Sequence, residues 1–295
     1  MKDHSFMESD VIVIGGGNII GPGFWLFKDS NIDLLETHKN IVFLNVGVTK
    51  DSFHDHVFRD KIINLKAKWW VRDIESQDIL STFNVQSTFL PDISLTLSDR
   101  INVVKKTKTI GVLLNAYPLN DLFNNNDVYL NQRAHQFARV LAHHLDWMAS
   151  FGWKIEFIPC HISTLIDDRI IAAVVMGYMK RKECATWHVE KHNWMSIAGL
   201  IAQCELVFSM RYHASTTAVA THTPFVDLVH HDKNKQFVKY MDMESCAVNI
   251  WSASHQDMIQ ATTRSEASST KHWIQPGIAV NLWKDFDKQW IDILG

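Results

Sequence analysis

Two residues close together in the sequence, Arg211 and His213, offer the clearest potential for chemistry in this chain of 295 residues. Arg211 follows a predicted strand over 206–210, and His213 precedes a predicted helix over 214–221. An arginine presents a planar fork of donors to a carboxylate or phosphate, and a histidine can move a proton near neutral pH. Because the free N–H groups of a helix start add positive potential, this segment predicts an anion site. The alternative is a buried arginine that pairs across the two domains, beside a histidine that only fills the core.

Two further cations follow other predicted strands. Lys233 lies after a strand predicted over 224–229, and Arg72 follows one predicted over 69–71. Ligands in parallel sheets bind beyond the carboxyl ends of the strands, so both cations are candidates for binding the same anion. Taken singly, Lys233 could be a solvated surface charge, and Arg72 could form a local ion pair with Asp73 at a helix start.

Asn115 and His161 are further candidates for substrate binding. Asn115 lies at the end of a strand predicted over 109–117, and His161 follows one predicted over 153–158. Both residues are therefore expected at the carboxyl ends of their strands, where ligands bind.

Glycine is concentrated in one loop, since five of the 12 glycines lie between Gly15 and Gly23. The loop follows an apolar run over 10–15 that is typical of a buried parallel strand. It matches neither GxGxxG nor a Walker loop. Such glycines let a ligand approach the backbone and leave N–H groups for an anion, while a tight structural turn is the alternative. The candidate substrate-binding residues here are Gly15, Gly16, Gly17 and Asn18.

The sequence favours neither a metal site nor a serine nucleophile. His188 and His192 have the i, i+4 spacing of two ligands on one helix face, but Glu190 is not in the HExxH position. No GxSxG segment is present. We therefore expect no metal.

Composition limits the class of protein. A hydrophobic share of 46%, a charged share of 21% and a net charge of −3 are typical of a globular protein without the basic surface that binds nucleic acid. The longest apolar run, over 170–179, is about half the length of a membrane span, and residues 1–5 begin no signal peptide. Four cysteines without a CxxC pair favour a reducing compartment. We expect a cytoplasmic protein that contacts membranes at most peripherally.

Apolar runs alternate with helical periodicity along the chain, which predicts an α/β fold. A polar stretch over 98–108 separates two such series. We expect a first Rossmann-like domain over 1–105, a second over 106–278 and a C-terminal helix over 279–295. The remaining expected strands cover 41–48, 88–90 and 247–251, and the remaining expected helices cover 24–38, 51–67, 74–84, 131–151, 167–180, 193–204 and 237–241.

Several of these residues lie in segments that match one known family in order and spacing. The most specific segment is Arg211-x-His213-Ala214, followed by Lys233-x-x-x-Phe237. The other segments are Asp10 to Asn18, Val71-Arg72-Asp73-x-x-Ser76, and Phe157 to His161 with Asp168. Over about residues 10–245 the chain resembles the polysaccharide pyruvyl transferase family. The resemblance implies two Rossmann-like domains in a GT-B-like arrangement, with the C-terminal helix packing back toward the first domain.

The resemblance also implies an activity. Pyruvate would pass from phosphoenolpyruvate to two hydroxyls of a saccharide or lipid-linked saccharide, which forms a cyclic ketal and releases phosphate. Arg72, His213 and Lys233 would serve donor binding and catalysis, with Arg211 as a further candidate. No cofactor besides the donor is expected, because lysine and arginine can neutralise the phosphate. A glycosyltransferase that uses a nucleotide sugar and an inactive saccharide-binding relative are the alternatives.

The chain departs from the family at two points. Its triple-glycine strand begins at Asp10, whereas the family usually has a further βα unit before this strand, so the first domain is expected to be trimmed. Asn115 stands where the family often carries an arginine.

Overall fold

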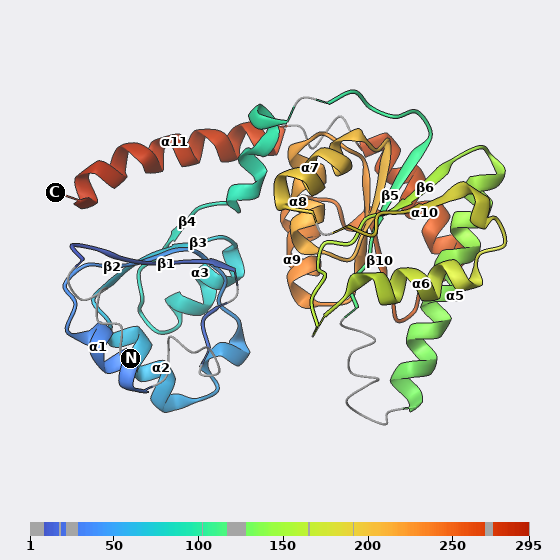
Figure 1. Ribbon diagram of the computed structural model, residues 1–295. Coiled ribbons are helices and arrows are strands. Elements are labelled where there is room, and N and C mark those ends of the chain that lie inside the picture. The colour runs from blue at the N-terminus through green and yellow to red at the C-terminus, as the bar shows by residue number, and fades with distance from the viewer. Residues whose placement is uncertain are drawn as a thin grey trace. The chain divides into compact units, whose positions relative to one another are not determined.

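The computed structural model describes residues 9–17, 19–21, 29–101, 103–116, 128–164, 166–190, 192–268 and 274–294. The chain forms two compact units (Figure 1). Unit 1 comprises residues 1–93 and 278–295, and unit 2 comprises residues 94–277. Each unit is built on one parallel sheet.

The sheet of unit 1 has the strand order β1-β2-β3-β4. Its strands are β1 (Ile12–Gly17), β2 (Ile41–Val46), β3 (Ala67–Val71) and β4 (Thr88–Phe89). Between them lie α1 (Asp29–Glu36), the 3-10 helix η3 (Lys50–Phe53), α2 (His56–Asn64) and α3 (Ile74–Ser81). The central strands β2 and β3 are mostly apolar, and Phe43 stacks on Trp69 with ring centroids 3.9 Å apart. This mostly apolar character is typical of strands buried in a parallel sheet.

Aspartate caps set the helix starts of unit 1. The Asp55 carboxylate accepts a hydrogen bond from the Phe58 N–H at 3.0 Å, and the Asp73 carboxylate accepts one from the Ser76 N–H at 2.7 Å. Such caps satisfy N–H groups that have no partner within the helix. The single helix expected over 51–67 is wrong, because η3 and α2 divide this stretch and β3 begins at Ala67. Of the helix expected over 24–38, residues 24–28 lie outside the described residues.

The last helix, α11 (Ile274–Leu294), completes the core of unit 1. Phe286 packs edge-on against Trp70 with ring centroids 5.3 Å apart, and Val42 belongs to the same buried cluster. The indole N–H of Trp283 donates to the Pro91 carbonyl at 2.9 Å. The prediction that the C-terminal helix packs against the first domain is confirmed.

The sheet of unit 2 has the strand order β10-β9-β8-β5-β6-β7. Its strands are β5 (Thr109–Leu113), β6 (Lys154–Phe157), β7 (Ala185–Trp187), β8 (Leu206–Ser209), β9 (Phe225–Val229) and β10 (Ala247–Asn249). The helices are α5 (Val128–Ser150), α6 (Asp168–Tyr178), α7 (Trp194–Gln203), α8 (Tyr212–Ala220), α9 (Asp232–Tyr240) and α10 (His255–Ser268), with 3-10 helices η4 (Ile93–Arg100), η5 (Lys182–Cys184) and η6 (Glu244–Cys246). Helices α5, α6 and α10 cover one face of the sheet, and α7, α8 and α9 cover the other (Figure 1). No described helix is long and apolar enough to cross a membrane.

Unit 2 differs from the expected elements at three places. The helix expected over 237–241 begins at Asp232, so Lys233 lies in its first turn rather than in a loop. The strand β7 and the helix α10 were not expected, because β7 has only three residues and α10 is largely polar. The cap Asp167 of α6 was expected, and its carboxylate accepts from the Arg169 N–H at 3.0 Å.

The polar stretch over 98–108 is attached to unit 2. It begins within η4, whose Ser94 hydroxyl donates to the Thr216 hydroxyl at 2.6 Å. Further along, the Lys105 ammonium donates to the Thr223 hydroxyl at 2.9 Å, and the Lys106 N–H donates to the Gln203 carbonyl at 2.7 Å. These hydrogen bonds explain why the two units divide after Ile93.

The packing of α11 gives a first prediction. Phe286→Ala should lower the free energy of unfolding by about 3 kcal/mol, because it removes a buried aromatic ring and leaves a cavity. Urea unfolding followed by tryptophan fluorescence measures this change. Lys288→Ala is the control on the same helix, since its ammonium pairs with Asp285 at the surface, and we expect a change within about 0.5 kcal/mol. Equal stability of Phe286→Ala and Lys288→Ala would contradict this packing.

Candidate functional site

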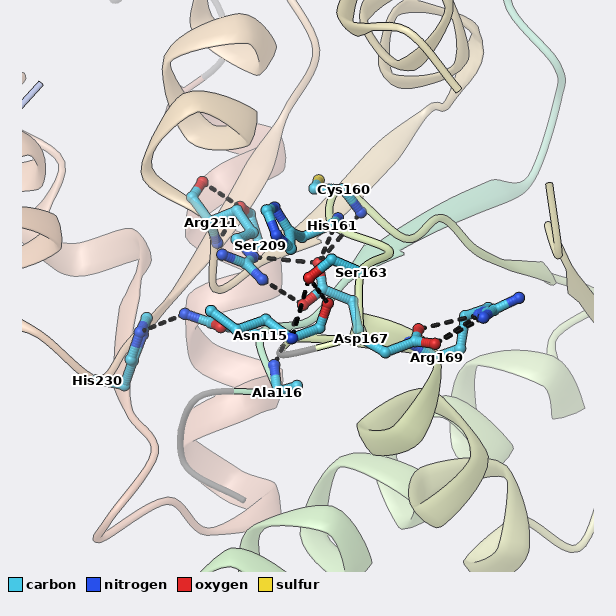
Figure 2. Close-up of polar contacts among 12 residues, drawn as sticks. Asn115, Ala116, Cys160, His161, Ser163, Asp167, Arg169, Ser209, Arg211 and His230 are labelled. Atoms are coloured by element: carbon cyan, nitrogen blue, oxygen red, sulfur yellow. Dashed lines mark hydrogen bonds and ion pairs between the residues drawn. The ribbon is translucent and has the colours of Figure 1, made fainter. Parts of the chain in front are cut away.

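The polar candidates of unit 2 lie beyond the carboxyl ends of its strands (Figure 2). β5 is followed along the chain by β6 on one side, while β8 flanks it on the other side. The strand order therefore reverses between β5 and β8. Ligands of open parallel sheets bind outside such a switch point. Asn115 and Arg211 follow these two strands, so the topology alone places them at this position.

The carboxylate of Asp168, the first residue of α6, joins three loops at this edge. Its Oδ1 accepts from the Ala116 N–H at 3.2 Å, and its Oδ2 accepts from the N–H groups of Cys160 at 3.2 Å and His161 at 2.9 Å. The Arg211 guanidinium completes the set, with Nε 3.2 Å from Oδ2 and with Nη2 on Oδ1. The loops after β5, β6 and β8 thus share one acceptor.

The burial of this carboxylate explains its many partners. Asp168 is 1% exposed, and a buried charge is tolerated only when it is paired and hydrogen-bonded. Its position at the start of α6 adds the favourable potential of the helix N-terminus. Arg211 is therefore ion-paired with a residue of its own unit, whereas the alternative interpretation had the arginine pairing across the two domains. The Arg211 side chain is 23% exposed, so the ion pair does not remove it from solvent.

Asn115 connects the loop after β5 to the loop after β9. Its side-chain N–H₂ donates to Nε2 of His230 at 3.0 Å (Figure 2). Burial, reinforced by the charge of Lys233, lowers the pKa of His230 to about 4. His230 is therefore neutral at pH 7, as an acceptor nitrogen must be.

His213 and Lys233 lie in the first turns of two neighbouring helices. β8 and β9 pair in parallel, so α8 and α9 both start at the same sheet edge. The His213 ring is exposed and lies edge-on to Trp194, with centroids 5.9 Å apart. Lys233 is half-buried, and its N–H donates to Nδ1 of His231 at 3.3 Å. A histidine and a lysine at two helix N-termini form a region of positive potential.

Arg72 belongs to unit 1, where it follows β3. The side chain is buried, and its Nη1 lies 3.5 Å from Oδ2 of Asp92. Its Nε lies 3.9 Å from Oδ2 of Asp73, the cap of α3. The structure thus contains the local ion pair at a helix start that was the alternative to a ligand site.

The glycines of β1 have a structural requirement of their own. Gly16 and Gly17 have φ angles of 83° and 87°, which favour glycine, and a Cβ on Gly15 would lie 2.9 Å from the Leu44 carbonyl oxygen. All three glycines lie within β1, so the backbone of this strand itself requires glycine, and a role for Gly15, Gly16 and Gly17 in substrate binding stays a prediction. Asn18 lies outside the described residues.

Two further groups of residues bear on a nucleophile and on a metal site. Burial, reinforced by Asp168, raises the pKa of the Cys160 thiol to about 12, so Cys160 is a protonated thiol and not a nucleophile. Within the part of the chain that the structure describes, no three His, Cys, Asp or Glu side chains are grouped to hold a metal ion.

Comparison with known proteins decides the family. The sequence model for polysaccharide pyruvyl transferase matches residues 2–232. The chain belongs to the polysaccharide pyruvyl transferase family. This family consists of transferases, and its name implies a saccharide acceptor. A comparison with curated proteins gave no match.

Solved structures confirm the GT-B-like α/β fold of this pyruvyl transferase family member. S. aureus MnaA, solved with UDP, has a TM-score of 0.61 at 10% identity, over 98% of this chain and 78% of that one. The UDP-GlcNAc 2-epimerase of Methanocaldococcus jannaschii has a TM-score of 0.60 at 10% identity, over 90% of this chain and 72% of that one. Identities this low establish the fold alone.

In this pyruvyl transferase family member, the structure brings Asn115, His161 and Arg211 together at one edge and places His213 and Lys233 on neighbouring helices there. No role was expected for Asp168, although it lies in a segment that matches the family. Its position beside the cap Asp167 could have indicated a further role, because a helix start needs only one capping acid and this one has two in succession.

The Asp168 cluster gives a second prediction. Asp168→Asn should lower the free energy of unfolding by about 3 kcal/mol, because it leaves the Arg211 charge uncompensated and replaces an acceptor by a donor. His161→Ala is the control, since its exposed imidazole can be removed while its N–H still donates to Asp168. We expect His161→Ala to change stability by no more than about 0.5 kcal/mol in the same urea titration. A stable Asp168→Asn protein would show that Asp168 does not hold this edge together.

Proposed function

We propose that the protein transfers pyruvate from phosphoenolpyruvate to two hydroxyls of a saccharide. Family membership carries this proposal, and the placement of His213 and Lys233 on adjacent helix starts supports it. Phosphoenolpyruvate bears a phosphate and a carboxylate, both of which suit helix N-termini and a lysine.

The proposed reaction balances without an added reagent. The enol CH₂ carbon of the donor gains a proton and becomes a methyl group, while C2 forms two C–O bonds to the acceptor and its C–O bond to phosphate breaks. The two hydroxyls supply two protons, of which one goes to the methyl carbon and the other leaves with phosphate. The reaction needs no cofactor besides the donor.

Each candidate residue has a role in this proposal. His213 either moves one of these protons or stabilises the leaving phosphate, and Lys233 neutralises charge on the donor. Arg211, held by Asp168, presents its remaining donors to the substrate at the switch point. Arg72 is proposed to bind the donor because it lies in a segment that matches the family. Asn115, His161 and the glycines Gly15, Gly16 and Gly17 are proposed to contact the acceptor or the donor edge.

The acceptor class and the compartment are part of the same proposal. The acceptor is a saccharide or a lipid-linked saccharide, reached by at most a peripheral membrane contact. We place the protein in the cytoplasm, because its four cysteines are free and free thiols suit a reducing compartment.

The direct test supplies phosphoenolpyruvate with a panel of galactose, mannose and glucuronate glycosides. We expect phosphate release and a new methyl signal in the proton NMR spectrum of the acceptor. If phosphoenolpyruvate neither stabilises the fold against heat nor releases phosphate, the proposal is wrong. Stabilisation by UDP instead would favour a glycosyltransferase, and glycan binding without turnover would favour an inactive relative.

A third prediction separates His213 and Lys233 from nearby surface charge. His213→Ala and Lys233→Ala should each lower kcat/KM for phosphoenolpyruvate by about 100-fold or more, since each removes a proton carrier or an anion contact. Lys235→Ala is the matched control, because this exposed lysine lies on the same helix as Lys233. Phosphate-release kinetics should leave Lys235→Ala near the wild-type value. An equal loss in all three variants would point to net charge and not to a specific site.

A further inference from the structure

A carboxyl group lies buried beneath the two helix starts that carry His213 and Lys233. Asp227, on β9, has an exposed fraction of 0%. Its Oδ2 accepts from the Ser215 hydroxyl at 2.6 Å, and its Oδ1 accepts from the Asn234 side-chain N–H₂ at 3.1 Å. Ser215 and Asn234 are themselves fully buried. These three side chains form what we call the Asp227 triad.

The triad connects the two helices through their first turns. Ser215 lies two residues after His213 on α8, and Asn234 directly follows Lys233 on α9. Neighbouring positions in a helix are held rigidly by the backbone, so fixing Ser215 and Asn234 also fixes the backbone of His213 and Lys233. Both helix starts thus share Asp227 as an acceptor.

The triad also reaches the strand that leads to Arg211. Asp227 lies opposite Ser209 in the parallel pairing of β8 and β9. The Asn234 side-chain nitrogen lies 3.5 Å from the Met210 carbonyl oxygen, at the end of β8. One buried group therefore sets the relation of α8, α9 and the end of β8.

The surroundings of Asp227 argue against a role in stability alone. Burial raises the pKa of Asp227 to about 7, and the hydrogen bonds from Ser215 and Asn234 offset this only in part. A buried carboxyl without a cationic partner costs folding free energy, and a buried polar set whose members are all replaced by apolar side chains often loses no stability. What an apolar side chain cannot supply is the pair of directed hydrogen bonds to two helices.

We propose that Asp227 is a positioning residue, which sets the distance and orientation between His213 and Lys233 through Ser215 and Asn234. The kinetic part of this inference rests on the proposed pyruvyl transfer. Asp227 is not a catalytic residue, because it has no exposed surface with which to touch a substrate.

The test compares two substitutions of the same carboxyl group. Asp227→Leu removes both hydrogen bonds and keeps the branching at Cγ in a larger side chain, and Asp227→Asn keeps both the size and a carbonyl oxygen that can accept from Ser215. We expect Asp227→Leu to lose at least about tenfold in kcat for phosphoenolpyruvate, because small misplacements of reacting groups are costly, and Asp227→Asn to recover most of that loss. Thr262→Val is the matched control, since Thr262 is a buried hydroxyl of unit 2 that pairs with His144 and not with this site. We expect wild-type kcat for Thr262→Val.

The positioning role of Asp227 can also be tested in a protein that shows no turnover. The imidazole signals of His213, assigned by their loss in His213→Ala, should shift in Asp227→Leu and stay unchanged in Thr262→Val. If the wild type does not use phosphoenolpyruvate, the proposed function fails, while these shifts still decide the positioning role. If Asp227→Leu does not fold, Ser215→Ala removes one arm of the triad and should produce the same shifts. Wild-type His213 signals in the folded variant that is tested would overturn the inference, as would a folded Asp227→Leu protein with wild-type kcat.

Discussion

A carboxylate with no access to water has to find its hydrogen bonds within the protein, and Asp168 finds them in three different loops. The N–H groups of Ala116, Cys160 and His161 and the guanidinium of Arg211 all point at its two oxygens. Loss of any one of these donors would leave the buried Asp168 carboxylate with an unsatisfied hydrogen-bond position, which costs free energy. The carboxyl edge of the second sheet therefore has one shape, in which Arg211 is oriented before any ligand arrives. In the proposed reaction, such preorganisation means that binding does not have to order the loops.

Local patterns predicted the sheet well and the helix boundaries less well. The apolar runs that became β2 and β8 end at Gly47 and Ser209, which are visible in the sequence, whereas β5 ends at Leu113, before the end expected for this strand. The start of α9 was predicted too late, because Asp232 to Lys235 is a polar segment without the apolar periodicity of a helix. The helix begins there because a ring nitrogen of His231 caps it. The strand β7 is too short to produce a pattern, and its parallel pairing with β6 is a tertiary effect.

For the candidate site, the sequence predicted where the residues lie in the fold but not which residues they pair with. The rule that ligands bind beyond strand ends correctly brought Asn115, His161 and Arg211 to one edge. It could not show that Arg211 pairs with Asp168, or Arg72 with Asp92, because these partners are distant in sequence or separated by a strand. The charge that remains for an anion therefore depends on contacts that only the folded chain reveals. For the same reason Asp227 went unnoticed as a polar residue inside an apolar strand.

The position of α11 has a consequence for the order of folding. Trp70 and Val42 belong to the first part of the chain, but the side chains that cover them, Phe286 and Leu282, are synthesised only after the whole of unit 2. During translation unit 2 can therefore acquire its complete core first, although domains usually fold from the N-terminus onward. Until Phe286 leaves the ribosome, the nascent chain carries an uncovered aromatic surface on unit 1. Chaperones that bind exposed apolar segments have their longest opportunity there, on the part of the protein that was made earliest.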